Sequence, residues 1–139
     1  MDMISKKSIN ALTREIIGAA IEVHKILGPG LLEKVYEAAM MHELQLRGLK
    51  AVRQQPILVN YKGVDLDVEL RYDILVEDLI ICELKSTTEM RPIFDATLIS
   101  YLKHLKKPKG ILINFYVRNL YYEGQKTFVN EFFAALPEG

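Results

Sequence analysis

The sequence lacks what several classes of protein require. Its single cysteine, Cys82, cannot form an internal disulfide, and no Cys and His residues have the spacing of a zinc site. No apolar run approaches the ~18–20 residues of a membrane span, and the first residues lack the apolar core of a signal peptide. We therefore expect a soluble protein of the cytoplasm, without a membrane partner.

An excess of one charge is also missing. Eighteen Lys and Arg residues balance eighteen Asp and Glu residues. This balance excludes a general polycation that wraps nucleic acid by bulk electrostatics, although a local basic groove is compatible with it. The 139 residues are 50% hydrophobic and 26% charged, which is an ordinary globular composition. The length predicts a single domain over residues 1–139.

Three stretches have the apolar spacing of amphipathic helices. Residues 9–27 carry an apolar residue every three or four positions, and the Gly-Pro-Gly segment at 28–30 ends the predicted helix. A second helix is predicted from about residue 31 to 48. A third is predicted from about 92 to 105, with a proline in its first turn.

The remaining segments favour β-structure. Residues 52–61 are rich in β-forming residues, and residues 66–76 alternate between apolar and mostly charged side chains, which predicts a strand with one buried face. Residues 79–85 predict a short central strand, and residues 111–115 a buried one. Turns are indicated at 61–63 and 77–78.

The C-terminal part is less regular. We predict a weaker strand near residues 120–122 and a short helix within 127–136. The resulting order αα-βββ-α-β predicts an α/β (α+β) sandwich, in which helices flank a mixed central sheet. The order does not fit a doubly wound fold.

Three charged residues are predicted to meet at one edge of this sheet. Glu83 and Lys85 share one face of their strand because strand side chains alternate. An odd-length loop over 77–79 pairs Asp73 with Glu83, whereas a two-residue loop pairs Asp73 with Cys82 and separates the carboxylates. The first register also aligns the apolar residues of the two strands, namely Tyr72, Ile74 and Val76 with Ile80, Cys82 and Leu84. Burial therefore favours the register that brings the carboxylates together.

Two carboxylates and a lysine suit metal-dependent chemistry on phosphates. Mg²⁺ prefers oxygen ligands and keeps several waters, so one or two carboxylates and a substrate phosphate suffice to hold it. The lysine could orient a water or stabilise charge that develops on a phosphate.

These residues resemble a known family. Residues 30–36, GLLEKVY, match the motif of the GxxExxY proteins, and Asp73 followed by Glu83-Leu84-Lys85 resembles the core of the PD-(D/E)XK nuclease superfamily. The resemblance covers roughly residues 9–122 and implies a restriction-endonuclease-like fold with metal-dependent phosphodiesterase activity. It further implies Asp73 and Glu83 as ligands of Mg²⁺ or Mn²⁺ and Lys85 as the catalytic lysine. Glu33 is implied as a further acidic member of the site, which assists through the metal or through a water.

One position departs from the family pattern. Relatives carry a glutamine in the helix after the core, just ahead of a Leu-Leu-x-Tyr-Leu stretch, and Thr97 stands in that place here. Threonine is shorter and has no amide, so it cannot reach a phosphate or a water in the same way. This difference motivates a second hypothesis, in which the fold binds nucleic acid without cutting it.

Simpler roles are open for each candidate. Glu33 suits the first turn of a helix through the helix dipole, Asp73 resembles other solvated strand residues, and Glu83 with Lys85 could be a surface ion pair. The basic cluster is either a contact for nucleic-acid phosphates or a solvated helix end, and it comprises Lys103, Lys106, Lys107 and Lys109 beside His104. The aromatic C-terminal residues could cover a partner subunit in a homo-oligomer or close the core. DNA and RNA are equally compatible as nucleic-acid partners.

Overall fold

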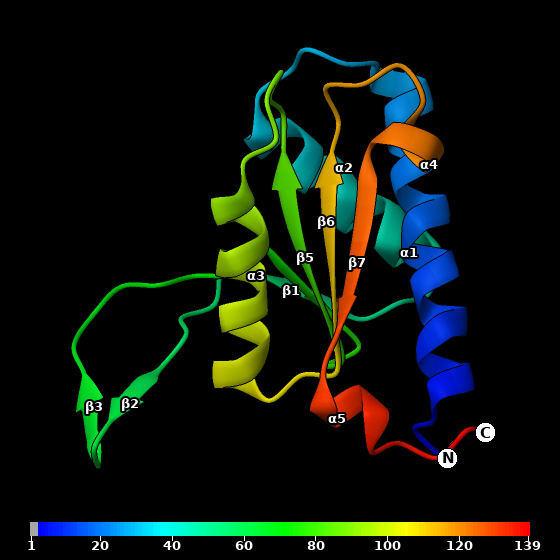
Figure 1. Cartoon of the computed structure of the whole chain (residues 1–139). Helices are drawn as coiled ribbons and strands as arrows, with labels where there is room; N and C mark the ends of the chain where they lie inside the picture. The colour runs from blue at the N-terminus through cyan, green and yellow to red at the C-terminus, as the bar shows by residue number, and fades with distance from the viewer. Residues whose placement is uncertain (1–2) are drawn as a thin grey trace.

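A five-stranded mixed sheet lies at the centre of the fold, in the strand order β1-β4-β5-β6-β7 (Figure 1). The structure is a computed structural model that describes residues 3–139. The sheet strands are β1 (Ala51–Arg53), β4 (Ile74–Val76), β5 (Ile80–Lys85), β6 (Lys109–Asn114) and β7 (Gln125–Val129). The helices are α1 (Lys6–Leu27), α2 (Glu33–Leu46), α3 (Pro92–Leu105), α4 (Leu120–Glu123) and α5 (Glu131–Ala134). Two further strands, β2 (Val59–Tyr61) and β3 (Val64–Leu66), form a separate hairpin.

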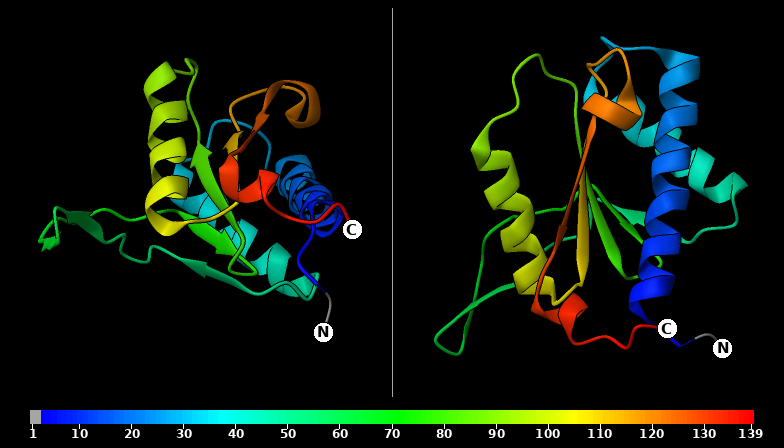
Figure 2. Two further views of the ribbon diagram at one scale, coloured as in Figure 1. Left: turned by 60° about the horizontal axis from the view of Figure 1, so that its bottom comes forward. Right: turned by 45° about the vertical axis from the view of Figure 1, so that its right-hand side comes forward.

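Helices cover both faces of the sheet, as Figure 2 shows. The larger hydrophobic cluster packs α1 and α2 on one face and includes the fully buried Cys82. The smaller cluster packs α3 on the other face, through Leu98 and Leu102 against Ile81 and Leu112. This arrangement confirms the predicted α/β sandwich with a mixed central sheet.

The register of the two central strands is the one that the sequence favours. β4 pairs with β5 antiparallel, with Ile74 opposite Cys82 and Val76 opposite Ile80. The connection turns through Glu77 and Asp78, which both have positive φ. Continued by one residue, this register sets Asp73 opposite Glu83.

The predicted continuous strand over residues 66–76 is wrong. Only residues 64–66 and 74–76 are strands, and between them the chain makes one isolated bridge, Pro56 to Arg71. Because the chain bends at Asp73, the alternation of faces is interrupted there. Tyr72 packs in the α3-side cluster, whereas Ile74 packs in the α1-side cluster.

The C-terminal elements also differ from the prediction. Residues 120–123 form α4 rather than a strand, because the Asn119 side chain accepts a hydrogen bond from the Tyr122 N–H and caps a helical turn. The strand follows as β7, which pairs with β6. Because β7 takes residues up to Val129, the predicted helix within 127–136 is confined to α5.

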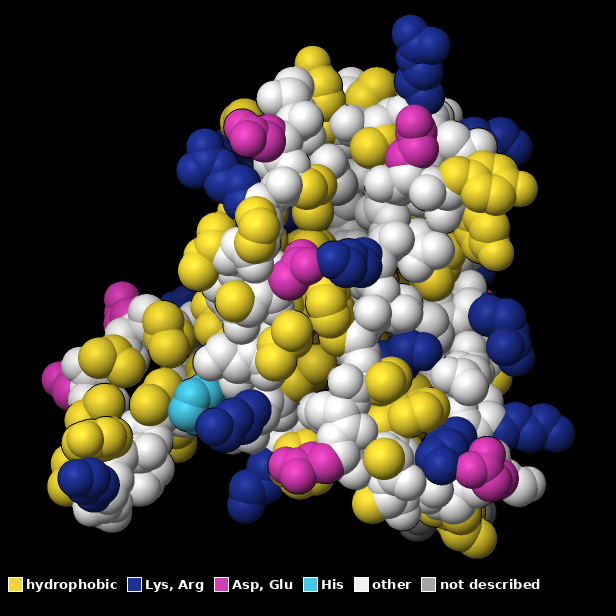
Figure 3. Space-filling model, in the orientation of Figure 1, with side chains coloured by type: hydrophobic (Ala, Val, Ile, Leu, Met, Phe, Trp, Pro, Cys, Tyr) yellow, Lys and Arg dark blue, Asp and Glu magenta, His cyan; other side chains and the backbone are white. Residues whose placement is uncertain are grey.

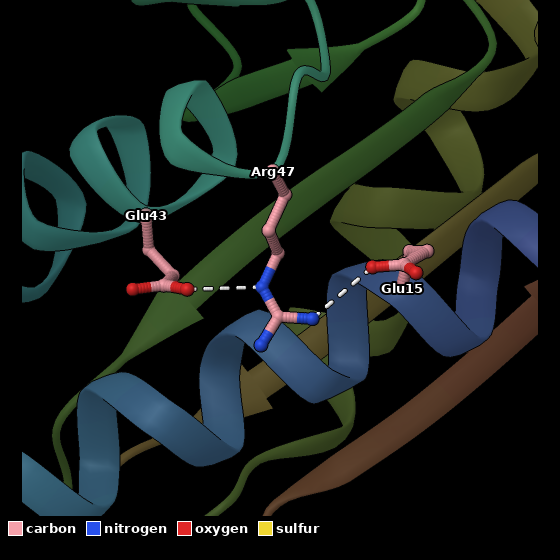
Figure 4. A network of polar contacts seen from close by, with 3 residues as sticks. All are labelled: Glu15, Glu43 and Arg47. Atoms are coloured by element: carbon pink, nitrogen blue, oxygen red, sulfur yellow. Dashed lines mark hydrogen bonds and ion pairs between the residues drawn. The ribbon is translucent and has the colours of Figure 1, made fainter.

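An ion pair network joins the first two helices at their surface (Figure 4). Arg47, at the end of α2, donates to Glu43 at 2.9 Å and to Glu15 of α1 at 3.1 Å. These bonds raise the pKa of Arg47, chiefly through the hydrogen bond to Glu43. The network links the C-terminal end of α2 to α1, while the buried apolar residues of the two helices pack together beneath it. No helix within residues 3–139 has the length and apolarity needed to cross a membrane.

Candidate active site

Asp73 and Glu83 meet where β4 and β5 separate. The Asp73 backbone N–H donates to Oε1 of Glu83 at 3.3 Å, and Oδ2 of Asp73 accepts from the Leu84 backbone N–H at 2.7 Å. The carboxylates of two neighbouring strands are therefore held beside each other by both backbone and side-chain atoms.

Glu83 is the more unusual member of this pair because it is only 8% exposed. Burial raises the pKa of Glu83 to about 9, and the neighbouring charge of Asp73 adds to the rise. Lys85 opposes the shift but has a smaller effect. Glu83 thus holds a proton at neutral pH unless a positive charge is supplied beside it.

Glu33 enters the same region from the first turn of α2. It lines a pocket of about 190 Å³ together with Lys34, Glu37, Gln54, Asp73 and Leu84. Within this pocket Nε2 of Gln54 donates to Glu37 at 2.6 Å and to Asp73 at 3.3 Å. Gln54 therefore links the helix to the strand that carries Asp73.

The donor set is compatible with a hard divalent cation. Carboxylate oxygens are the ligands that Mg²⁺ and Mn²⁺ prefer, and Mg²⁺ needs only one or two protein carboxylates. Among residues 3–139, no three Asp, Glu, His or Cys side chains gather closely enough to hold a metal ion. The fit therefore depends on the Asp73–Glu83 pair, while Glu33 lines the pocket together with Asp73.

Lys85 lies two residues beyond Glu83 on the same strand. Its Nζ is 4.2 Å from the centre of the Phe94 ring, which comes from the first turns of α3. A cation over an aromatic face is attracted to it, so Phe94 restricts where the ammonium lies. The Lys85 side chain is half-buried, so part of it is exposed to solvent.

The two carboxylates also affect the pKa of Tyr101 on α3. Its pKa is raised first by burial and then by the charges of Glu83 and Asp73. Tyr101 packs against the α3-side cluster. Its place near the carboxylates was not predicted.

Sequence reasoning also missed Glu37 and Gln54. The four-residue spacing between Glu33 and Glu37 places both on one side of α2, and this signal could have identified Glu37. Gln54 offered no such signal, because its position depends on a bend after β1 in which it has a φ of 52°.

Tyr36 organises the segment before α2. It is fully buried, and its ring stacks on Phe115 at a centroid distance of 4.3 Å. Its hydroxyl donates to the Gly28 carbonyl and accepts from the Leu31 N–H at 3.1 Å. Tyr36 therefore packs in the core and also holds the chain that leads into Glu33.

The basic cluster does not gather as predicted. Lys109 is 7% exposed, and its Nζ donates to Asn10 at 3.2 Å, so it is not available to a phosphate. Lys107 pairs with Asp78 at 2.8 Å, while Lys103 and Lys106 are exposed. Lys109 lies opposite Ile80, at the far end of β5 from Lys85. Lys109 is therefore three residues away from the strand position of Glu83, because Glu83 pairs with Leu112.

Comparison with known proteins identifies the superfamily of the chain. A family model described as the PD-(D/E)XK nuclease superfamily matches residues 10–127. The chain belongs to the PD-(D/E)XK nuclease superfamily. The matched part of this superfamily domain includes Glu33, Asp73, Glu83 and Lys85. Neither a search of curated proteins nor one of solved structures found a match.

Proposed function

We propose that this protein hydrolyses phosphodiester bonds in nucleic acid with the help of Mg²⁺ or Mn²⁺. The observation that carries the proposal is the Asp73–Glu83 pair, with Lys85 two residues further on, inside a domain of a nuclease superfamily. The seven residues at 30–36 support a narrower place among the GxxExxY proteins.

In this proposal Asp73 and Glu83 hold the cation, and Glu33 assists through the cation or through a bound water. When bound, the cation supplies Lewis-acid activation of a phosphate oxygen and of water. Glu83 gives up its proton on binding, since only the carboxylate is a ligand. The ammonium of Lys85, held over Phe94, orients the attacking water or stabilises charge on the phosphate.

A second candidate is a nucleic-acid-binding module with the same fold and no cleavage. It is favoured by Thr97, which is half-buried on α3 where the family pattern has a longer amide side chain. Of the four predicted lysines, Lys103 and Lys106 are the exposed ones and could contact phosphates in that case.

Titration calorimetry with Mn²⁺ tests the metal site without a guess about the substrate. We expect the wild type to bind Mn²⁺ and both Asp73→Ala and Glu83→Gln to lose that binding. Asp67→Asn, an exposed carboxylate on the β2–β3 hairpin, is the matched control and should bind like the wild type. Equal heats in all four proteins would contradict the assignment.

Cleavage assays then separate the two candidates. Single- and double-stranded DNA and RNA are incubated with Mn²⁺ and either wild type or Glu83→Gln. Metal-dependent cleavage that is lost in the variant supports a nuclease. Salt-dependent binding without cleavage, weakened by substitution of Lys103 and Lys106, favours the binding module.

A further inference from the structure

The hairpin of β2 and β3 extends away from the body of the protein as an arm (Figure 1). We define the arm as residues 55–72. Its cross-strand pairs, Val59 with Leu66 and Tyr61 with Val64, set four apolar side chains on one face. Tyr61 and Val64 are each 60% exposed and Leu66 is 39% exposed.

An arm that packs against nothing is expected to have little stability of its own. A two-stranded hairpin is marginally stable in water without a hydrophobic surface to pack on. Two further apolar side chains flank the hairpin, namely Leu58 and Val68, which are 68% and 49% exposed. Exposed apolar side chains gathered in this way mark a site of interaction with another molecule.

The charges of the arm argue against nucleic acid as that molecule. Three carboxylates, Asp65, Asp67 and Glu69, are exposed on its β3 side. The basic residues of the arm are Lys62 at the tip and Arg71 at the base, and Arg71 lies 3.5 Å from Glu69. The remaining excess of carboxylates disfavours a phosphate backbone, whereas a surface with apolar and basic residues would be complementary.

The outer side of α3 is such a surface. Ile93 and Ile99 are 62% and 50% exposed, and Ala96 between them is exposed as well. Lys103 and Lys106 continue the same side at helical spacing. Figure 3 shows hydrophobic side chains both along the arm and over the helix α3 beside it. The acidic residue of this helix, Asp95, is half-buried and bonded to Lys126.

We propose that the arm of one copy docks on the outer side of α3 of a second copy, and the reverse, in a two-fold symmetric dimer. The apolar face of each arm would cover Ile93 and Ile99. Asp67 and Glu69, which follow β3 outside the paired strands, would lie near Lys103 and Lys106. An isologous interface of this kind uses both surfaces of both copies, so no complementary surface is left to extend a chain of molecules.

The arm also begins and ends at the candidate site. The Gln54 backbone N–H donates to the Asp73 carbonyl at 3.0 Å, at the base of the arm. Docking of the arm would therefore restrain both residues. The dimer itself does not depend on the proposed nuclease function, and its test needs no activity assay.

Charge reversal on each surface tests the reciprocal contact. The arm variant is Asp67→Lys with Glu69→Lys, and the helix variant is Lys103→Glu with Lys106→Glu. Each variant alone places like charges against each other across the dimer, and we expect its dimer to weaken at least about tenfold. An equimolar mixture of the two variants restores opposite charges at both contacts, and we expect dimers to return to near the wild-type level.

Analytical ultracentrifugation measures the dimer in the wild type, the arm variant, the helix variant and the mixture of the two variants. Circular dichroism checks that each variant is folded. Tyr122→Ser, an 81% exposed aromatic on α4, is the control and should dimerise like the wild type. A monomeric wild type at 100 µM, on the order of the weakest specific dimers, would overturn the proposal. So would variants that dimerise normally, or a mixture that stays monomeric. Reduced nucleic-acid binding by the helix variant with an unchanged dimer would assign these lysines to phosphate contact instead.

Discussion

The carboxylate of Glu83 lies against Asp73, whose backbone N–H donates a hydrogen bond to it at 3.3 Å. A buried acidic residue thus lies beside a half-buried one. A buried carboxyl group beside a second acid cannot ionise easily, so the fold retains a proton there that the unfolded chain would release. This arrangement costs stability at higher pH and prepares the pair for a cation.

The first prediction concerns stability without metal. The pKa of Glu83 is raised from 4.5 to about 9, so its contribution to stability is fully present below pH 4.5 and is lost as pH rises towards 9. Glu83→Gln keeps the shape and stays neutral. We expect the free energy of unfolding of this variant to exceed that of wild type by an amount that grows between about pH 5 and 9, by up to about 1.4 kcal/mol per pH unit.

Urea unfolding in a chelating buffer at several pH values measures this difference. Glu69→Gln, which replaces an exposed carboxylate on the arm, is the control and should track the wild type. If the free energies of unfolding of wild type and Glu83→Gln changed with pH in parallel, Glu83 would be ionised in the native state.

The second prediction concerns the proton released on metal binding. Because Glu83 is protonated at neutral pH, Mn²⁺ has to displace that proton before both carboxylates can act as ligands. Apparent affinity should therefore rise with pH, by up to about tenfold per unit below pH 9. Calorimetry in buffers of different ionisation enthalpy counts the protons, and we expect close to one at pH 7. Binding with no proton release would exclude Glu83 as a ligand.

The central register is the part of the fold that could be predicted with most physical detail. Ile74 and Val76 had to share a face with Ile80 and Cys82, and that condition alone sets Asp73 opposite Glu83. Burial and chemistry required the same pairing, so a shift by one residue would have broken both.

Other parts depended on features that spacing does not encode. Tyr72 continues the alternation of Ile74 in the sequence, yet a bend at Asp73 turns it to the other face of the sheet. Lys109 resembled the other lysines of its cluster, but it begins the central strand β6 and is buried. Gln54 reaches the site only through a positive φ. The positions of these three residues depend on tertiary structure, and the local sequence pattern does not predict them.

The third prediction tests how Tyr36 supports the site. Its buried hydroxyl bonds to two backbone groups in the segment before α2. Tyr36→Phe keeps the stacking on Phe115 and leaves those groups without their partner. We expect a loss of about 1–3 kcal/mol in the free energy of unfolding. Tyr122→Phe, on an exposed aromatic, should change it little, and an equally small effect at Tyr36 would show that water replaces the hydroxyl.

The last prediction concerns Thr97, the position that separates the two candidate functions. On α3 it lies three residues after Phe94, whose ring contacts the Lys85 ammonium, and four before Tyr101, whose pKa responds to Glu83 and Asp73. Residues three and four apart share a side of a helix, so Thr97 lies between two residues that already reach the site.

A glutamine there would bring an amide that can donate and accept hydrogen bonds to the region of the attacking water. We expect Thr97→Gln to raise Mn²⁺-dependent cleavage by about tenfold or more, because a positioned donor near developing charge contributes on that scale. Thr97→Leu adds similar bulk without the amide and should give no gain. If the glutamine and leucine variants cleave equally, the threonine is not the missing polar group, and a silent wild type would then owe its inactivity to some other part of the site.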